Sequence, residues 1–212
     1  MRAVFFSAAV LASQISIAAT PIDGWYSTLF GGYAYLPNNV TLTSGGNTWS
    51  QPTYHFGYDV GGSIGFKSNP MRYEGELTYV KANVDGFKVN NISQTGIDGY
   101  SDAFLAMANV YYDFPAFLPC IQPYLGVGVG YGIVEAMLKG QGPYAQTRFS
   151  GRNGVFAYQP IAGFAYNYSE NFAITASYRY VATNRVDDLG KIFQSHLANV
   201  GLVFRFNSGT YK

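Results

Sequence analysis

Apolar and polar residues alternate with a period of two along most of this chain. The clearest apolar face in this alternation comprises Tyr54, Phe56, Tyr58, Val60, Ile64 and Phe66. The intervening positions hold glycine, serine and charged residues. Because successive side chains of a β-strand point to opposite faces, the pattern predicts a strand with one apolar and one small or polar face. Its aromatic ends are typical of strands that cross a bilayer between two aromatic girdles.

The same alternation recurs in further segments, and no stretch after residue 19 shows convincing helical periodicity. Eight strands are predicted, at about residues 24–36, 53–67, 71–82, 100–114, 123–135, 155–167, 172–182 and 193–206. The two faces of the first segment are both rich in aromatics and glycine, so its orientation stays open. In the fifth segment, glycine alternates with larger residues. Such a face leaves room for large side chains of other strands in a narrow interior.

The connections between these segments alternate in length. Short turns are predicted at residues 67–71, 115–122 and 167–171, and long polar loops at residues 37–52, 82–99, 136–154 and 182–193. Outer-membrane barrels combine short periplasmic turns with longer extracellular loops. The sequence therefore predicts an all-β fold, an eight-stranded antiparallel up-and-down transmembrane β-barrel.

The N-terminus has the features of a secretory signal peptide. Arg2 precedes an uncharged apolar run that ends in small residues, and cleavage is expected near Ala19. This run is shorter than the roughly 20 residues that a helix needs to span a bilayer. We expect residues 1–19 to be the signal peptide, residues 20–212 to be the barrel, and the location to be the bacterial outer membrane.

Composition narrows the possible functions. Charged residues make up only 12% of the chain and the formal net charge is +1, which gives no basic surface for nucleic acid. Aromatic residues reach 17%, yet mean hydropathy is only +0.02, as expected where lipid-facing and inward-facing residues alternate. The single cysteine, Cys120, cannot form an internal disulfide.

A soluble eight-stranded barrel of the lipocalin kind is the alternative fold. Its apolar face would point inward around a ligand, and its outer face would have to keep the protein in solution. Here that outer face would hold mostly glycine, serine, threonine and asparagine, with few charges for solubility. The membrane barrel is therefore favoured.

Four segments carry a family resemblance: "MANVYYDF", "QPYLGVGVGYG", "ASYRY" and the closing "NVGLVFRF". In this order and spacing they resemble the outer-membrane β-barrel family that includes opacity-type surface antigens and the transmembrane domain of outer membrane protein A. The resemblance implies that the last strand ends in an aromatic residue recognised by the outer-membrane assembly machinery. Phe206 would be that residue, although "NSGTYK" follows it, and Tyr211 is the alternative.

Charged residues on predicted inward faces form a candidate lumen cluster, which comprises Glu74, Glu76, Arg179 and Arg205. Such charges fill the lumen in the family that the chain resembles, and buried charges must pair or be solvated. Two interpretations follow. A rearranging salt bridge would gate an ion path, whereas a fixed one would be a structural plug. The plug is favoured because an eight-stranded interior is just wide enough for side chains to fill it.

Outer-membrane proteases and lipid A-modifying enzymes have their catalytic groups around the last long loop. Asp187, Asp188 and His196 lie there, but His196 lacks the His-x-Ser spacing of lipid A deacylases, and His55 has no Ser or Cys at productive spacing. Omptin-type proteases have ten strands, more than are predicted here. The alternating glycines from Gly126 lead into a strand, which excludes a dinucleotide loop. We expect no enzyme activity, cofactor or metal site.

The long loops are the parts that partners would meet. The third loop mixes basic and aromatic residues, and its contact candidates are Lys139, Tyr144, Arg148, Phe149 and Arg152. They would touch lipopolysaccharide or a host surface, unless the loop is simply solvated and variable. The sequence predicts a surface protein with a membrane-integrity and adhesion or immune-interaction role. A narrow ion or small-solute channel is the alternative, and a lipid A-modifying enzyme is less favoured.

Overall fold

The computed structural model describes residues 22–37, 41–42, 49–54, 57–89, 92–93, 95–116, 118, 120–141, 146–186 and 191–206. The predicted signal peptide lies outside these ranges. None of the described residues belongs to a helix long and apolar enough to cross a membrane.

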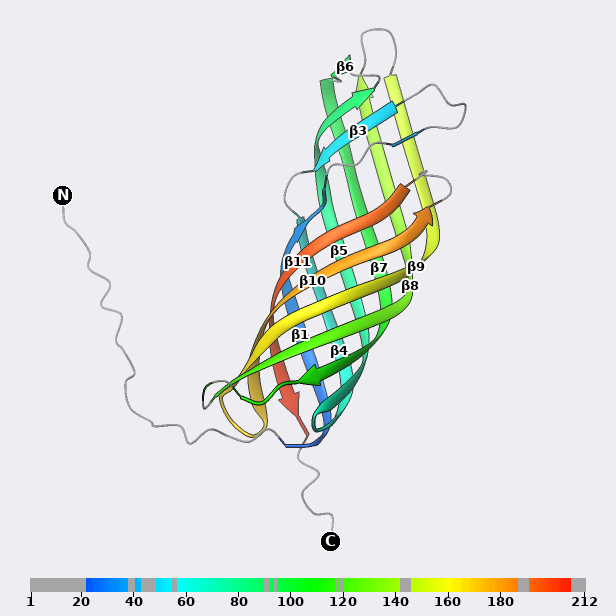
Figure 1. Ribbon diagram of the computed structural model, residues 1–212. Coiled ribbons are helices and arrows are strands. Elements are labelled where there is room, and N and C mark those ends of the chain that lie inside the picture. Colours follow the sequence, from blue (N-terminus) through cyan, green and yellow to red (C-terminus); the bar gives the residue numbers. More distant parts are fainter. Residues whose placement is uncertain are drawn as a thin grey trace, which may run out of the picture.

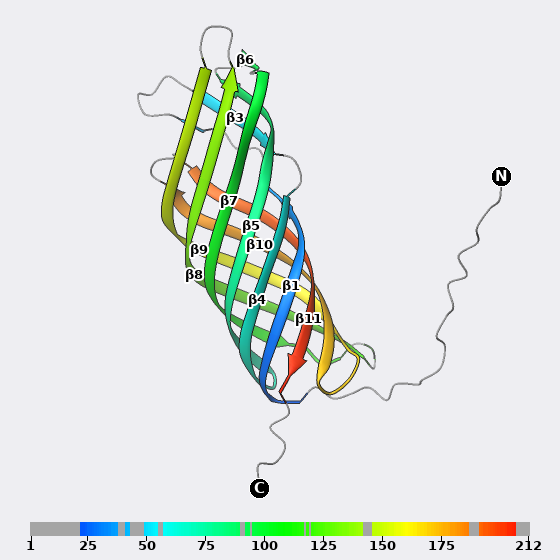
Figure 2. The same ribbon diagram turned by 180° about the vertical axis from the view of Figure 1, so that it is seen from behind.

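Eight strands close into one antiparallel barrel (Figures 1 and 2). They are β1 (Gly24–Tyr35), β4 (Gly57–Ser68), β5 (Met71–Val89), β7 (Thr95–Asp113), β8 (Ile121–Gln141), β9 (Gln146–Asn167), β10 (Phe172–Val186) and β11 (Lys191–Arg205). Each pairs with the next, and β1 also pairs with β11, which closes the barrel. The predicted eight-stranded antiparallel barrel is confirmed. Three short strands are not part of this ring: β2 (Thr41–Leu42), β3 (Trp49–Tyr54) and β6 (Ile92–Ser93). β2 pairs with β3, and both β3 and β6 pair with the later part of β5.

One end of the barrel carries the short connections, together with the start of β1 and the end of β11 (Figure 1). Asn69 and Pro70 form the turn between β4 and β5, and residues 168–171 connect β9 to β10. Backbone bonds fasten neighbouring connections, since the Asp113 N–H donates to the Pro70 carbonyl over 2.8 Å and the Arg205 N–H to the Asn171 carbonyl over 2.7 Å. We call this the short-turn end.

The outer face of the barrel is a band of apolar side chains. Leu29, Ile64 and Val127 in this band are 64%, 62% and 65% exposed, which in water would form a large aggregation-prone surface. Aromatics such as Trp25, Tyr131 and Phe204 are exposed on the same outer face. The orientation of β1, open at the sequence level, is settled by burial of its even-numbered Tyr26, Phe30 and Ala34. The lipocalin alternative is wrong, because the apolar face points outward.

A row of charged residues marks one limit of the apolar band. Lys81, Asp102, Glu135 and Arg152 are direct register partners across β5, β7, β8 and β9. Two tyrosines reach into this row, as Tyr79 Oη donates to Asp102 Oδ2 over 3.1 Å and Tyr100 Oη to Glu135 Oε1 over 3.3 Å. Charges are costly in hydrocarbon and tolerated at its boundary, so the row lies at the membrane interface.

Inward-facing glycines of β8 accommodate large side chains of β7. The register pairs Gly126 with Tyr111, Gly128 with Asn109, Gly130 with Met107 and Gly132 with Leu105. A Cβ on Gly130 would lie 2.7 Å from Met107 Sδ, closer than real Cβ contacts. The expectation that this glycine face makes room for other strands is confirmed.

Four strands are much longer than a membrane crossing requires. β5 and β7 have 19 residues each, β8 has 21 and β9 has 22, whereas about 9–11 residues span the hydrocarbon. Their excess lengths rise together beyond the rest of the barrel, with β3 alongside (Figure 1). We call this extension the protruding sheet.

The predicted loops at residues 82–99 and 136–154 are therefore wrong in large part. Residues 82–89, 92–93, 95–99, 136–141 and 146–154 are strand. Polar and apolar residues do not alternate regularly in residues 136–154, so a period-two pattern does not mark this stretch as strand. Ladder hydrogen bonds, which sequence alone does not reveal, maintain the strands beyond the bilayer.

The predicted strand at residues 53–67 is also corrected. Its start belongs to β3, which pairs with the far end of β5 through partners such as Pro52 and Phe87, whereas β4 begins at Gly57. β10 continues to Val186 and β11 begins at Lys191, so the last loop is shorter than expected. Tertiary pairing, not local pattern, decides these ends.

Placing a charge in the outer band tests the assignment of this face to lipid. Val129 lies midway along the outward side of β8, and Ile133 lies one outward position from Glu135 of the charged row. We expect Val129→Arg to lower the free energy of unfolding by about 2–4 kcal/mol and Ile133→Arg by about 0–1 kcal/mol, because the penalty falls towards the interface. Urea titration in lipid vesicles measures both, and equal penalties would contradict the assignment.

Candidate functional site: the barrel lumen and the protruding sheet

Inward side chains divide the lumen into three layers along the barrel axis. The lower charged layer, at the short-turn end, contains Tyr26, Lys67, Arg72, Glu74, Tyr111, Asp113, Tyr124, Asn167 and Arg205. The middle polar layer contains Asp59, Glu76, Thr78, Asn109, Gln159, Arg179 and Asn199. The upper apolar layer lies nearest the protruding sheet and contains Ala34, Leu36, Val80, Ala82, Ala103, Leu105, Met107, Val134, Val155, Ala157, Val181, Phe193 and Leu197.

Glu76 is the hub of the middle polar layer. Its Oε1 accepts hydrogen bonds from Arg179 Nη1 over 2.7 Å and Thr78 Oγ1 over 2.6 Å. Its Oε2 accepts from Asn109 Nδ2 over 2.6 Å, and Gln159 Nε2 donates to Asn109 Oδ1 over 2.9 Å. Four strands thus converge on one buried carboxylate, which is 3% exposed as a residue. A charge this deeply buried is tolerable only because it is paired and hydrogen-bonded.

Asp59 and Asn199 form a second contact in the middle polar layer. Inside the barrel, Asn199 Nδ2 of β11 donates a hydrogen bond to Asp59 Oδ2 of β4. Gly32 of β1 stands between them in the register, paired on one side with Asp59 and on the other with Asn199. Since glycine has no side chain, the two larger residues can meet over it.

Arg72 organises the lower charged layer. Its guanidinium lies 4.7 Å from the ring centroids of both Tyr111 and Tyr124, a cation–π arrangement. Arg72 Nε donates to Asp113 Oδ1 over 2.8 Å, and Lys67 Nζ donates to Asp113 Oδ2, also over 2.8 Å. A single carboxylate therefore serves two cations.

Glu74 and Arg205 complete this layer. Tyr26 Oη donates to Glu74 Oε1 over 2.6 Å, and Arg72 Nη1 lies 3.6 Å from the same oxygen. Arg205 Nη2 donates to Asn167 Oδ1 over 2.7 Å, and Arg205 Nη1 donates to the Glu170 carbonyl over 3.2 Å. Both acceptors of Arg205 are neutral.

The four lumen charges named from the sequence are all buried in the interior, but they do not form one cluster. Only Glu76 and Arg179 contact each other. Glu74 and Arg205 lie in the lower charged layer with different partners. The sequence-level set omitted the cations and carboxylates that complete the layers, Asp59, Lys67, Arg72 and Asp113. The same alternation that selected Glu74 also places these residues on inward faces.

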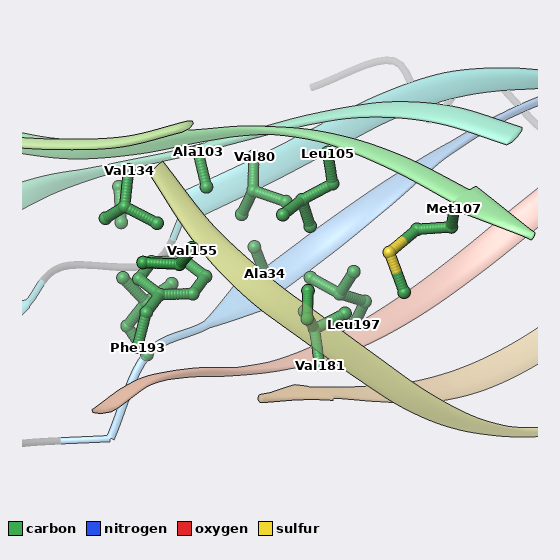
Figure 3. Packing of buried hydrophobic residues seen from close by; sticks show 13 residues of the cluster. Ala34, Val80, Ala103, Leu105, Met107, Val134, Val155, Val181, Phe193 and Leu197 are labelled. Carbon is green, nitrogen blue, oxygen red and sulfur yellow. The ribbon is translucent and has the colours of Figure 1, made fainter. Parts of the chain in front are cut away.

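The upper apolar layer was not expected from the sequence (Figure 3). Leu105 and Leu197 are 1% and 0% exposed, and they pack with valines and alanines from facing strands. At this level the inward and the outward side chains are both apolar. Polar and apolar residues therefore do not alternate, and the sequence pattern does not reveal an apolar interior. Hydrocarbon side chains make up most of this level of the lumen. The buried hydroxyl residues Ser101, Thr183 and Ser195 lie beside it, as register partners of Ala82, Ala157 and Val181.

His196 lies on the outer face of β11 among tyrosines. Tyr178 Oη lies 2.5 Å from His196 Nδ1, and the rings of Tyr35 and Tyr180 lie 5.9 Å and 5.0 Å from the imidazole. This surrounding is typical of an interfacial aromatic belt. The other catalytic candidates, His55, Asp187 and Asp188, lie outside the described residues.

Phe206 lies at the short-turn end, immediately after β11. Its N–H donates to the Trp25 carbonyl over 2.9 Å, and its ring lies 5.2 Å from that of Phe204. The alternative aromatic, Tyr211, lies outside the described residues.

The loop contact candidates belong to the protruding sheet. Lys139 of β8 is the register partner of Arg148 of β9, and Glu135 is the partner of Arg152. Phe149 pairs with Leu138. They therefore stand on a paired β-hairpin and not, as predicted, on a polar loop. Tyr144 lies outside the described residues.

The protruding part of β9 is paired along one edge only in the described structure. Residues 146–166 pair with β8, but pairing with β10 extends only as far as Ala157. The Asn167 N–H donates to the Cys120 carbonyl, so odd-numbered residues of β9 bond towards β8 and even-numbered ones towards the other edge. Pro160 agrees with this, because the β10 ladder skips its position. Residues 146–156 thus present an open β-edge.

Breaking the Glu76–Arg179 pair tests its role in the interior. We expect Arg179→Met to lower the free energy of unfolding by about 3–5 kcal/mol, because the Glu76 charge is left buried without its cation. The double variant R179M/E76Q should lower the free energy of unfolding by less than R179M alone, because it leaves no unpaired charge at position 76. Urea unfolding in detergent micelles measures both. A double-variant loss equal to the sum of the two single losses would rule out direct coupling.

Comparison with known proteins agrees with this architecture. Residues 3–206 match the family described as "Outer membrane protein beta-barrel domain". A curated "Outer membrane protein" from Gluconacetobacter diazotrophicus is 29% identical over 192 residues, which cover 80% of this chain and 49% of that one. The chain thus spans about half the length of this relative.

Solved structures share the fold at low sequence identity. The outer membrane protein OprG from Pseudomonas aeruginosa aligns with a TM-score of 0.55 at 13% identity, covering 90% of this chain and 100% of that one. Neisserial surface protein A aligns with a TM-score of 0.50 at 17% identity, covering 86% and 97%. Because the family match includes all of its described residues, the chain belongs to the outer membrane protein beta-barrel domain family.

Proposed function

We propose that this outer-membrane barrel acts at the cell surface as an interaction protein, binding an extended segment of a partner along the protruding sheet. In outer-membrane barrels the short turns face the periplasm and the longer connections face outward. The short-turn end is then periplasmic, and the protruding sheet stands outside the cell.

The open edge of β9 carries this proposal. The even-numbered residues from 146 to 156 direct backbone donors and acceptors to this edge, where they are unpaired in the described structure. An exposed strand edge is a template for another strand, and several recognition domains bind peptides by such strand addition. At about 3.3 Å per residue, this edge is roughly 35 Å long. A partner segment of similar length could pair along it.

Charge favours an acidic partner. The hairpin region from Ala136 to Gly154 contains Lys139, Arg148 and Arg152 and no Asp or Glu. Complementary charge speeds association and selects among partners. The same cations would attract lipopolysaccharide phosphates, but phosphate binding does not need the backbone N–H groups of an open edge. The favoured partner is therefore an extended acidic segment of a host-surface protein.

A backbone substitution on the open edge separates these two partners. Ser150 is even-numbered, so Ser150→Pro removes an N–H from the open edge without removing one from the β8 ladder. We expect cells expressing S150P to adhere several-fold less to host-cell monolayers, and S150A cells to adhere normally. Normal adherence by S150P, with loss in the double variant R148Q/R152Q, would contradict strand addition and indicate binding by charge alone.

The upper apolar layer argues against the channel alternative. Apolar constrictions exclude ions by dewetting, and here the layer draws on strands all around the barrel. We expect the protein in planar lipid bilayers to pass no measurable current. The double variant L105S/L197S should conduct, because it removes two of the bulky hydrocarbon side chains that fill the constriction, whereas V129S on the outer face should not. Steady single-channel conductance of the unaltered protein would favour the channel.

A non-enzymatic role is part of the proposal. The described contacts of His196 are tyrosine rings and a tyrosine hydroxyl, which do not supply the carboxylate that orients a catalytic histidine. We expect mass spectrometry to find unchanged lipid A in cells that express the protein. A new lipid A species would indicate a lipid-modifying enzyme.

We also propose that Phe206 is the aromatic residue read by the outer-membrane assembly machinery. Support comes from its place directly after the closing strand, packed against Phe204 at the periplasmic end. The partner lipids of the barrel are those of the outer membrane, which its apolar band contacts.

A further inference from the structure

The lower charged layer contains more cations than carboxylates. Lys67, Arg72 and Arg205 are buried there with only two acids, Glu74 and Asp113. Asp113 is shared by Lys67 and Arg72, and Glu74 lies near Arg72. These pairs leave one positive charge of the layer without a carboxylate.

Arg205 is the cation left over. It is 6% exposed, and its hydrogen bonds go to the side-chain oxygen of Asn167 and the backbone carbonyl of Glu170. Neutral acceptors orient a guanidinium but do not cancel its charge. A buried charge without a counter-charge is strongly unfavourable.

Asp59, the buried carboxylate without a cation partner, is too far away to neutralise the charge of Arg205. Asp59 contacts Asn199, which lies six positions along β11 from Arg205, or roughly 20 Å. Coulombic attraction over that distance is small beside the desolvation of a guanidinium. The lumen is neutral as a whole, yet its periplasmic end carries a local excess of one positive charge.

A small cavity lies among these cations. Its lining includes Lys67, Arg72, Asp113, Thr175 and Arg205. The accessible volume is about 10 Å³, close to the least that holds a single water-sized particle. The lining residues lie near strand ends at the short-turn end, so an ion could enter from the periplasm.

We propose that this cavity binds one small monovalent anion of the charge and size of chloride. Lys67, Arg72 and Arg205 supply the positive lining, and the Thr175 hydroxyl is a further donor. Chloride is somewhat larger than a water molecule, so the flexible Lys67 side chain has to shift slightly to admit it, whereas phosphate and sulfate are several times larger and do not fit. The bound anion neutralises Arg205 and so stabilises the periplasmic end of the barrel. The site is independent of the proposed surface function.

Chloride itself is the probe. The protein, purified from membranes in a non-ionic detergent, is titrated while the ³⁵Cl NMR linewidth is followed, since chloride bound to a slowly tumbling particle relaxes faster. In parallel, Tm is measured in sodium chloride and in sodium gluconate at equal ionic strength. We expect saturable line broadening and a higher Tm in chloride.

Three variants locate the site. R205Q should weaken chloride affinity about tenfold or more, the loss expected for a hydrogen-bonded charge, whereas R205K should retain binding. D113N should bind chloride more tightly and depend on it more strongly for Tm, because the cationic excess rises. R152Q removes an exposed arginine at the other end of the barrel. It is the control, and its chloride affinity and its Tm difference between chloride and gluconate should match those of the unaltered protein.

The outcomes decide the proposal even where a variant is unstable. Heat-dependent mobility on gels reports whether each variant is folded, and a D113N protein that folds only in chloride would support the site. Equal Tm in chloride and gluconate, or chloride broadening that R205Q leaves intact, would overturn it. Equal loss in R205Q and R152Q would indicate nonspecific attraction and reject it as well.

Discussion

The hydrocarbon of a bilayer offers no hydrogen-bond partner to a peptide backbone, and the architecture follows from this constraint. Every strand within the membrane must be paired on both edges, so the sheet has to close. The pairing of β1 with β11 provides that closure. Closure in turn sends one face of each strand to lipid and the other to a narrow interior. The apolar band outside and the compact layers inside are two consequences of one requirement.

The interior of a small barrel has to be filled, and its filling decides what the barrel can do. Glycines of β8 make room for Tyr111, Met107 and their neighbours, while charged groups occur in the two layers nearer the periplasm. The upper apolar layer fills the other end of the described lumen mainly with hydrocarbon. A lumen packed in this way disfavours a transport function and favours a function of the surface that is exposed to water.

Outside the membrane the constraint no longer holds, and the sheet changes accordingly. Water can solvate unpaired backbone groups, and among the described residues β9 continues beyond Ala157 with no paired strand on one edge. β5, at the opposite side of the protruding sheet, is instead covered by β3. The asymmetry leaves the described residues 146–156 of β9 as an open edge, in a region whose charges between Ala136 and Gly154 are all positive. This edge is the structural basis of the proposed surface function.

The number of barrel strands, their order and most of their faces could be predicted from the sequence, because a strand at a lipid boundary records its environment locally, residue by residue. The inward position of Glu76 and Arg179 followed from the same alternation. Their contact did not, since 103 positions separate them and only closure and register bring them together. Tertiary pairing also decided three further features. These are the apolar layer around Leu105, the extra length of β5, β7, β8 and β9, and the charge of Arg205 that no carboxylate matches. Where both faces of a strand meet the same surroundings, alternation vanishes, and only the paired neighbours determine how far the strand continues.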